Sequence, residues 1–408
     1  MSYRLIELEL TRPLEPVTLG PEEDGAGLIG RFRDRLVGFA LLPAAPGATL
    51  SVEELTAALD ARFGLNALTE CLAGELRRGQ LAPSIPAPSL TVAICTKDRA
   101  ARLERLLGTL APLLAASSGF AAVEGLVIDN APSDESTREA VARAPGFRYV
   151  REPRAGLDFA RNAALAAANG DLIAYLDDDV VVDRGWLAGL YEAWSKHPEA
   201  GAWTGLVLPF ELRTEAQIQF ERRGGFGRGF TPRVYRADRL DSRLYPVDAG
   251  TFGAGCNMAF DRKWLLGLGG FDEALDTGAP LPGGGDLDAF YRMVRSGRAL
   301  VYEPAYAVYH QHRETIPQLR RQYWTWGLGF MAFLAKAQRH DPPLKARHAG
   351  MLRWWFATAA TELLSALRRG RGRETAFAAA ELWGGVLGVA GEYDRSLRRV
   401  RRIREGVS

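Results

Sequence analysis

Cysteine is scarce in this chain of 408 residues. Its three cysteines, Cys71, Cys95 and Cys256, lie far apart in the sequence and form no C-x-x-C pair. Their number and spacing argue against a disulfide-bonded scaffold and against a zinc–thiolate site. We expect them to be small buried side chains in a reducing compartment.

Long apolar stretches are also missing. No part of the sequence approaches the roughly 18 uninterrupted apolar residues that a membrane-spanning helix needs. The N-terminus alternates charged and apolar side chains, whereas a signal peptide requires an unbroken apolar segment. The sequence therefore predicts a cytoplasmic protein, with peripheral contact at the inner face of the membrane as a further option.

An excess of one charge sign is absent as well. Lys and Arg number 51 against 49 Asp and Glu, so the net charge of +2 gives no reason to expect a nucleic-acid partner. Hydrophobic residues at 47% and charged residues at 25% are ordinary globular values and exclude a disordered or fibrous protein. The length exceeds what one compact core holds, so we expect two domains or one large domain with an appendage.

Composition divides the chain into four parts. Residues 1–80 are predicted to form a small α+β cap, because they begin with an alternating run and Ser51 is a suitable N-cap for a helix. Residues 81–89 contain three prolines and are predicted to be an extended linker. Residues 90–315 form the main domain in this division, and residues 316–408 a helical extension rich in Arg and Trp.

Within residues 90–315, short apolar runs alternate with helical stretches. This alternation predicts an α/β fold with a mostly parallel sheet covered by helices on both faces. Ligands of such sheets bind beyond the carboxyl ends of the strands, so polar residues just after the strands are the candidates for chemistry. The predicted strands are residues 90–95, 125–129, 147–151 and 172–176, and the predicted helices are residues 99–114, 136–144, 157–168 and 184–197.

An acidic triplet, Asp177, Asp178 and Asp179, follows the last of these strands. Three adjacent carboxylates repel one another and destabilise the fold unless a cation or a set of donors neutralises them. Mg²⁺ takes oxygen ligands, commonly one or two carboxylates together with substrate phosphates. The triplet therefore indicates a cation site, and a solvated acidic turn is the alternative.

Further candidates follow strands or begin helices. Asp129 could accept a hydrogen bond from a base NH or a ribose hydroxyl, or could simply end its strand in an Asx turn. Asp98 is predicted to cap the helix that follows it. Asp286 and Asp288 begin a helix after three glycines, so one would only cap it and the other could be a general base. His310 could bind a metal as neutral imidazole, although a lone histidine is more often only hydrogen-bonded.

Seven segments around these candidates form an ordered set. They are Val92–Arg99, Val127–Asn130, Gly156–Asn162, Tyr175–Val180, Gly253–Ala259, Gly284–Arg292 and His310–Arg313. Taken in order, they resemble the inverting glycosyltransferases of family 2, which have the Rossmann-like GT-A fold. Each segment is weak alone, but the order of all seven is specific, and the resemblance covers roughly residues 90–330.

The resemblance implies a divalent cation, Mg²⁺ or Mn²⁺, and a role for each matched position. Thr96 and Asp129 would hold the nucleotide, and Gly156 would start the helix beside it. Asp177 and Asp178 would belong to a DXD-type motif, with Asp178 nearer the ribose, and Asp179 and His310 would bind the metal. Asn257 would lie near the donor sugar and acceptor, and Asp286 would be the catalytic base. One position departs from the pattern, because the family often has Glu where this chain has Gly285. Counting back from Arg292 keeps Asp286 in register as the base, with Asp288 as the fallback.

The implied activity is inverting transfer of a hexosyl or deoxyhexosyl group from a nucleoside diphosphate sugar, a UDP- or dTDP-sugar, to an acceptor hydroxyl. The acceptor would be a glycan, a lipid-linked molecule or a small molecule. A nucleotidyltransferase is one alternative, but the loop Thr96–Arg99 is a poor match for its phosphate loop. A non-catalytic nucleotide-sugar-binding protein is another, although it would need no base at Asp286.

The helical extension contains the amphipathic stretch Met351–Arg369, which mixes apolar and basic residues at roughly helical spacing. An apolar helix face usually packs on protein, so we expect it to lie on the main domain or on a second subunit in a homodimer. Arg and Trp on such a helix also suit an anionic membrane surface, which is the alternative.

Overall fold

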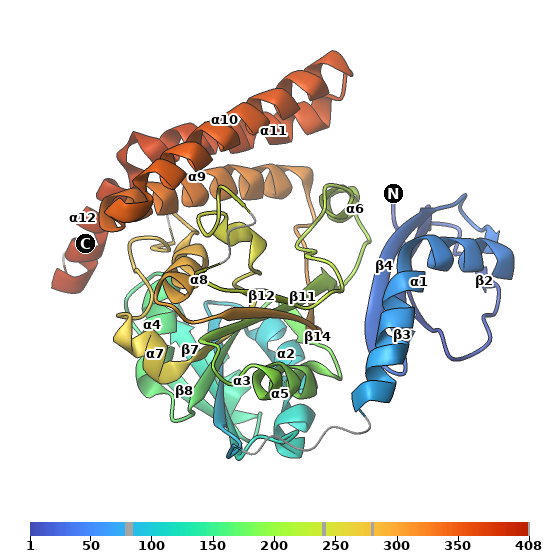
Figure 1. Ribbon diagram of the computed structural model, residues 1–408, viewed down its shortest axis with the longest axis horizontal. Helices are drawn as coiled ribbons and strands as arrows, with labels where there is room; N and C mark the ends of the chain where they lie inside the picture. Colours follow the sequence, from blue (N-terminus) through green and yellow to red (C-terminus); the bar gives the residue numbers. More distant parts are fainter. Residues whose placement is uncertain (78–84, 239–241, 279–280, 407–408) are drawn as a thin grey trace.

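The computed structural model describes residues 1–77, 85–238, 242–278 and 281–406. Over these residues the chain builds a nine-stranded sheet, a three-stranded sheet and a two-stranded pair. Figure 1 shows the large sheet in the middle of the molecule, the small N-terminal sheet beside it and the long C-terminal helices above it.

The large sheet has the strand order β10-β14-β11-β13-β9-β6-β7-β8, and β12 pairs with β14. Its strands are β6 (Ser89–Thr96), β7 (Ala122–Asn130), β8 (Phe147–Glu152), β9 (Leu172–Asp177), β10 (Val180–Val182), β11 (Ala202–Pro209), β12 (Arg233–Tyr235), β13 (Asn257–Asp261) and β14 (Leu300–His310). Neighbours among β8, β7, β6 and β9 run parallel, as do β11 and β14, whereas β10, β12 and β13 run antiparallel to their partners. The predicted mixed, mostly parallel sheet is therefore confirmed.

Helices cover both faces of this sheet and bury two separate hydrophobic cores. One core joins the sheet to α2, α3 and α5 through side chains such as Leu107 and Leu190. The other joins it to α4, α7 and α8 through side chains such as Phe159 and Phe290. These helices are α2 (Ala100–Ala116), α3 (Ser136–Ala142), α4 (Leu157–Ala167), α5 (Trp186–Lys196), α7 (Arg262–Gly267) and α8 (Gly285–Arg295), and the short helix η1 (Ala249–Thr251) joins the second core. Helix α6 (Glu215–Arg222) lies outside both cores and packs through Phe220 near Leu319 and Tyr323. Burial on both faces explains why the central strands are continuously apolar instead of alternating.

The N-terminal residues form a separate small sheet with one helix against it. The elements are β1 (Arg4–Glu9), β2 (Val17–Thr18), β3 (Gly25–Phe32), β4 (Arg35–Pro43), β5 (Thr49–Leu50) and α1 (Val52–Arg77). Ser51 caps α1 as predicted, since its Oγ accepts a hydrogen bond of 3.2 Å from Glu54 N. Gly30 and Gly38 leave room for the Phe63 ring, which a Cβ at either position would meet at 2.5 Å or less. We refer to residues 1–77 as the cap.

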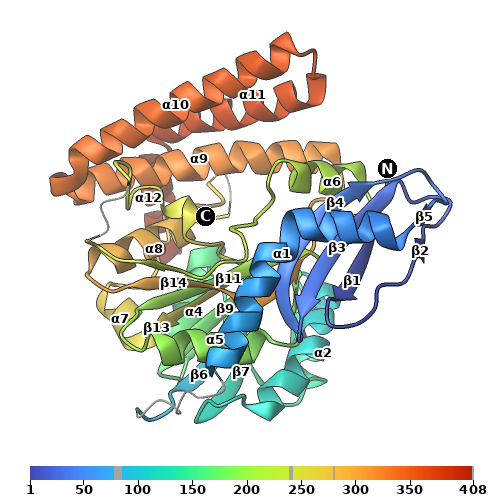
Figure 2. The same cartoon turned by 45° about the vertical axis from the view of Figure 1, so that its right-hand side comes forward.

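The C-terminal helices reach the main sheet domain chiefly through the first of them. They are α9 (Ile316–His340), η2 (Pro342–Leu344), α10 (Lys345–Arg368), α11 (Gly372–Leu387), η3 (Gly388–Glu392) and α12 (Tyr393–Glu405). The stretch Met351–Arg369, predicted to lie on the main domain or on a second subunit, packs mainly on the other C-terminal helices. Helix α9 lies between the sheet domain and the α10–α11 pair (Figure 2). It approaches α11 at backbone distance, because a Cβ on Gly327 would lie 2.1 Å from Glu381 O. Met351 of α10 is 1% exposed and belongs to the core around α8.

The predicted linker, residues 81–89, lies partly outside the described residues, and its last residue, Ser89, already begins β6. Helix α9 begins at Ile316, where the helical extension was predicted to start. The domain boundaries themselves stay predictions. In the part of the chain that the structure describes, no helix is both long enough and apolar enough to cross a membrane.

Candidate active site

A large cavity lies beyond the carboxyl ends of β6, β7 and β9, where the strand-end argument places ligands. Its volume is about 1300 Å³. The floor carries the acidic triplet Asp177–Asp179, and Asp286 at the start of α8 lies in the wall. Thr96, Gly156 and His310 also line it. The fold thus gathers most of the predicted site residues from segments more than 200 positions apart.

Asp178 is held rigidly at the end of β9. Its Oδ2 accepts a hydrogen bond of 2.7 Å from Thr96 Oγ1, and its Oδ1 accepts one of 2.9 Å from Arg99 Nη1. Its side chain is 4% exposed. Burial raises the pKa of Asp178, and Arg99 opposes that rise. Thr96 therefore acts on the site through Asp178, which links the ends of β6 and β9.

Asp179 and His310 face each other across neighbouring strands. Asp179 Oδ1 lies 3.4 Å from His310 Nε2, and both side chains are buried. Within the described residues this carboxylate oxygen has no hydrogen-bond partner. Burial lowers the pKa of His310 to about 4, so its imidazole is neutral at neutral pH.

A relay of hydrogen bonds determines which nitrogen of His310 carries the proton. His312 Nε2 lies 2.7 Å from Glu221 Oε1, and a carboxylate only accepts, so Nε2 of His312 is protonated. In the neutral form of His312, Nδ1 is then the acceptor in its 3.0 Å contact with His310 Nδ1. His310 Nε2 consequently presents a lone pair to Asp179 Oδ1. Two electron-pair donors that face each other at this distance fit a cation between them.

This donor set suits a hard divalent cation. One carboxylate and one neutral imidazole leave most coordination positions open, as Mg²⁺ and Mn²⁺ require when substrate phosphates supply further oxygens. Within the described residues, no group of three or more His, Cys, Asp or Glu side chains could hold a metal ion by itself. The residues present therefore fit a cation that is completed by a bound ligand.

Three arginines surround the same carboxylate. Asp179 Oδ2 lies 4.0 Å from an Nη1 atom of Arg99 and 3.8 Å from those of Arg102 and Arg313. Burial opposes ionisation of Asp179, but His310 first, and then Arg313, Arg99 and Arg102, lower its pKa below the usual value. The arginines also make this end of the cavity attractive to a polyanion such as a diphosphate.

Arg161 is the centre of a second charge cluster under the cavity. It is 4% exposed and donates a hydrogen bond of 2.9 Å to Asp158 Oδ1. Its Nη1 lies 3.6 Å from Asp276 Oδ2, and its Nη2 lies 4.0 Å from Asp177 Oδ1. Burial raises the pKa of Asp158 and of Asp177 to about 7, and Arg161 limits the rise. The cluster therefore shares protons near neutral pH instead of carrying a full charge on every carboxylate.

Asp286 is oriented by backbone amides. Its Oδ2 accepts from Gly255 N at 3.0 Å, and its Oδ1 accepts from Leu287 N at 2.9 Å. It lines the cavity and is half-buried. The fallback Asp288 is instead engaged in ion pairs with Arg292 at 2.6 Å and Lys336 at 2.8 Å, and is 1% exposed. The geometry favours Asp286 over Asp288 as a group that can reach a ligand.

The structure gives a reason for Gly285, the departure noted in the sequence. A Cβ at this position would lie 1.8 Å from Asp158 Oδ2. Asp158 comes from α4 and brings a carboxylate to the place that a side chain at position 285 would occupy. An acidic neighbour of Asp286 is thus supplied from a different element.

Two predicted residues are not brought to the cavity. Asp129 is fully buried and accepts a hydrogen bond of 2.8 Å from Tyr149 Oη, while its neighbour Asn130 lines the cavity. Asn257 is also fully buried, since it donates to the carbonyls of Tyr306 and Leu206 and accepts from Trp186 Nε1. Direct contact of these two side chains with a ligand therefore lacks structural support.

Asn130 connects to the predicted Gly156. Its Oδ1 accepts a hydrogen bond of 2.9 Å from Gly156 N at the start of α4. Gly156 has φ of +142°, a conformation that favours glycine. The chain at Gly156 can thus turn into α4 at the cavity edge.

The predicted N-cap role of Asp98 is wrong. Arg99 occupies the N-cap position of α2, and Asp98 adopts φ of +53°. The Asp98 carboxylate accepts instead from Ser133 N at 2.8 Å, in the loop after β7. Tertiary contact between two strand-end loops therefore replaces the local cap.

Sequence reasoning missed the residues that act through others, chiefly Arg161, Asp158 and the pair of His312 and Glu221. Arg161 lies inside the matched segment Gly156–Asn162, so its position could have been singled out. Glu221 lies 91 positions before His312, and no sequence spacing indicates their contact.

Comparison with known proteins identifies the part of the chain that carries the acidic triplet of this site. Residues 91–266 match the family model described as Glycosyl transferase family 2. The pre-mycofactocin glycosyltransferase of Mycobacterium tuberculosis is 25% identical over 355 residues, which cover 83% of this chain and 66% of that protein. Polypeptide N-acetylgalactosaminyltransferase 10 of Rattus norvegicus is 26% identical over 231 residues, which cover 52% of this chain and 36% of that enzyme. The chain thus spans at most 66% of the length of either relative.

Two solved structures are similar at low sequence identity. A mannosyltransferase from Pyrobaculum calidifontis, in complex with GDP-Man and Mn²⁺, is 18% identical with a TM-score of 0.49, covering 82% of this chain and 97% of that one. GalNAc-T7 with UDP, GalNAc and Mn²⁺ is 18% identical with a TM-score of 0.40, covering 63% of this chain and 51% of that one. Residues 91–266 are therefore identified as a family-2 glycosyltransferase segment, and they build most of a mostly parallel sheet of the GT-A type.

Proposed function

We propose that this protein transfers a sugar from a nucleoside diphosphate donor to an acceptor hydroxyl, with inversion at the anomeric carbon. The observation that carries the proposal is the buried pair Asp179 Oδ1 and His310 Nε2, 3.4 Å apart, in the same cavity as Asp286. A diphosphate bound at the first two residues would direct its sugar into the cavity that Asp286 lines.

The proposed base is Asp286. An acceptor hydroxyl is a weak nucleophile, so a carboxylate must take its proton as the oxygen attacks the anomeric carbon. The amides of Gly255 and Leu287 fix the carboxylate and leave each oxygen a further lone pair for that proton. One attack on the face opposite the leaving diphosphate inverts the configuration.

The proposed leaving-group site consists of Asp179, His310 and the surrounding arginines. Asp179 and His310 would hold Mg²⁺ or Mn²⁺, which when bound supplies positive charge to the departing diphosphate. Arg99 and Arg313 lie within 4.0 Å of Asp179 and can bind further phosphate oxygens. Asp178, fixed by Thr96 and Arg99, is placed to accept from ribose hydroxyls.

The test is turnover of a panel of UDP-, dTDP- and GDP-sugars with Mn²⁺, Mg²⁺ or EDTA. A transferase releases nucleoside diphosphate and forms a product of inverted anomeric configuration. Release of pyrophosphate from a sugar phosphate and a nucleoside triphosphate would instead indicate a nucleotidyltransferase. Saturable donor binding with no turnover in the presence of candidate acceptors would favour a nucleotide-sugar-binding protein.

Aromatic side chains of the C-terminal helices line part of the cavity and suit an acceptor with a flat hydrophobic group. These side chains are Trp326 and Phe330 of α9 and Trp354 and Trp355 of α10. Phe226 connects this wall to the metal site, with its ring centroid 4.9 Å from His310 and 5.7 Å from Trp326. Aromatic walls stack on flat apolar or sugar rings. We infer that the C-terminal helices contribute the acceptor site.

Trp354→Ala is expected to raise the acceptor KM by about tenfold, equivalent to about 1.4 kcal/mol of lost binding. The donor KM and the rate of donor hydrolysis should stay unchanged, because the nucleotide half of the cavity is intact. Trp383→Ala is the matched control, since Trp383 is 58% exposed on α11 and Trp354 is 52% exposed on α10. Equal acceptor KM values for the two variants would contradict an acceptor site on α10.

A further inference from the structure

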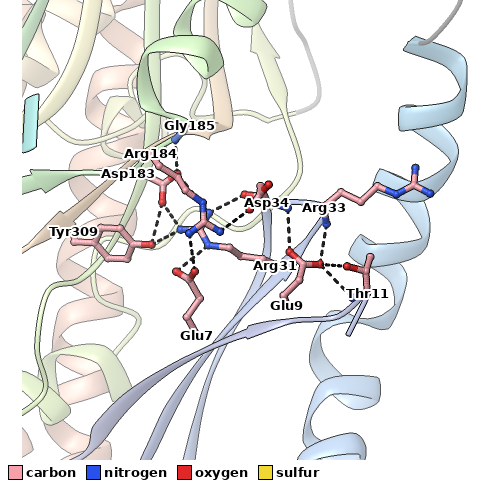
Figure 3. A network of polar contacts seen from close by, with 10 residues as sticks. All are labelled: Glu7, Glu9, Thr11, Arg31, Arg33, Asp34, Asp183, Arg184, Gly185 and Tyr309. Atoms are coloured by element: carbon pink, nitrogen blue, oxygen red, sulfur yellow. Dashed lines mark hydrogen bonds and ion pairs between the residues drawn. The ribbon is translucent and has the colours of Figure 1, made fainter. Parts of the chain in front are cut away.

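The cap reaches the metal-binding strands through one buried arginine. Arg31 on β3 is 2% exposed, and its guanidinium forms an ion pair with Asp183 of the main domain (Figure 3). Its Nη2 also donates a hydrogen bond of 2.8 Å to Tyr309 Oη. Tyr309 in turn donates to Asp183 Oδ2 at 3.1 Å, so the three side chains form a closed triangle.

The cap itself orients Arg31. Its Nη1 donates to the carbonyl oxygen of Asp34 at 2.8 Å, and its Nε lies 2.8 Å from Glu7 Oε2. These contacts come from the β3–β4 turn and from β1 (Figure 3). These contacts within the cap therefore fix the position of the guanidinium. That position depends on an intact cap sheet.

The two partners of Arg31 belong to the strands that carry the proposed metal ligands. Asp183 directly follows β10, which itself directly follows Asp179, and Tyr309 immediately precedes His310 on β14. Strands β10 and β14 pair antiparallel, with Val180 opposite His310 and Val181 opposite Tyr309. Successive side chains on a strand point to opposite faces, so Arg31 contacts the face of this ladder that is turned away from the cavity.

This two-strand ladder needs support from outside. Strand β10 has only three residues and is the edge of the sheet. Short edge strands have few ladder hydrogen bonds to hold them in place. A small shift of β10 against β14 would change the 3.4 Å separation of Asp179 Oδ1 and His310 Nε2.

We propose that Arg31 is a positioning residue through which the cap holds β10 and β14 in the geometry that binds the divalent cation. This inference rests on the proposed function, because it takes Asp179 and His310 as the cation ligands. Removing the guanidinium would leave Asp183 buried without its main countercharge, and the end of β10 would shift to solvate it. The cap would thus determine cation affinity although it contributes no residue to the cavity lining described above.

The test compares Mn²⁺ binding to the full-length chain and its variants, by calorimetry and by electron paramagnetic resonance of free Mn²⁺. Arg31→Met is expected to weaken Mn²⁺ binding by about tenfold or more, the range found when groups supporting metal ligands are removed. Arg31→Lys, which keeps the charge, should restore part of the affinity. Tyr309→Phe removes two hydrogen bonds with little change of volume and should weaken binding by several-fold, so it decides the question if Arg31→Met does not fold.

Arg35→Met is the matched control for attachment of the cap. Arg35 forms an ion pair with Glu192 on α5, a second link between cap and main domain whose partner lies neither on β10 nor at the Tyr309–His310 end of β14. Its loss should change Mn²⁺ affinity by no more than about twofold. An equal loss in Arg35→Met and Arg31→Met, or Mn²⁺ affinity in folded Arg31→Met and Tyr309→Phe close to that of the wild type, would overturn the positioning role alone. Absence of Mn²⁺ binding by the wild type would overturn the metal part of the proposed function and this inference with it.

Discussion

Asp286→Asn is expected to abolish sugar transfer while leaving nucleoside diphosphate binding near that of the wild type. The asparagine amide has the same shape and can still accept from Gly255 N through its oxygen. It cannot take a proton from the attacking hydroxyl, so the rate should fall by about 10²- to 10⁴-fold, the usual contribution of a general base. The measurement is single-turnover transfer, paired with calorimetric titration of UDP in the presence of Mn²⁺.

The pairing of these two measurements separates a chemical defect from a structural one. Loss of both transfer and UDP binding would indicate a damaged cavity and would not support Asp286 as the base. Transfer by Asp286→Asn within about tenfold of the wild-type rate would show that another group removes the proton. Asp177 would then be the next residue to test, because it lines the cavity and burial raises its pKa to about 7.

Asp179→Ala is expected to remove the Mn²⁺-dependent part of nucleoside diphosphate binding. His310 alone is a weak site for a hard cation, since Mg²⁺ and Mn²⁺ prefer oxygen ligands. Arg99, Arg102 and Arg313 remain, so weak binding that is independent of Mn²⁺ should persist and even increase once the competing carboxylate is gone. The measurement is the UDP dissociation constant with Mn²⁺ and with EDTA.

Glu221→Gln is expected to weaken the Mn²⁺-dependent part of nucleoside diphosphate binding without removing it. A glutamine amide can donate to His312 Nε2 as well as accept from it, so the proton arrangement that leaves His310 Nε2 unprotonated is no longer enforced. Mn²⁺-dependent binding should weaken by about 10- to 100-fold, as for other groups that orient a metal ligand. Full activity of the wild type in EDTA, or unchanged Mn²⁺ dependence in Asp179→Ala, would remove the cation from the mechanism.

Much of the main domain could be predicted from the sequence because its elements are encoded locally. The apolar runs at residues 90–95 and 172–176 became β6 and β9 with boundaries shifted by one residue at most. Continuous apolar strands alternating with amphipathic helices leave few ways to bury both faces of a sheet. The strand-end rule then predicted where Thr96, the acidic triplet and His310 would meet.

The same reasoning failed where a side chain had a choice of partners. Asp98 was predicted to cap α2, but it bonds to Ser133 because the loop after β7 comes within 2.8 Å. Asn257 follows a cavity segment, yet its amide satisfies the carbonyls of Tyr306 and Leu206 in the core. A sequence gives the hydrogen-bonding capacity of such residues, whereas the choice between partners depends on distances that only the folded chain sets.

The composition alone indicated a globular protein, since cysteine is scarce, charge is balanced and long apolar runs are lacking. Local sequence patterns then predicted the sheet, the carboxylates at the strand ends and the family. Tertiary structure decided the rest. Asp158 meets Gly285, Glu221 meets His312 and Arg31 meets Asp183, each across a long separation in the chain. Such contacts form only when separate elements pack together, because burying a charge is favourable only beside a partner that packing has already placed. The surroundings of the base, the tautomer of His310 and the link from the cap to the cation site are therefore properties of the fold.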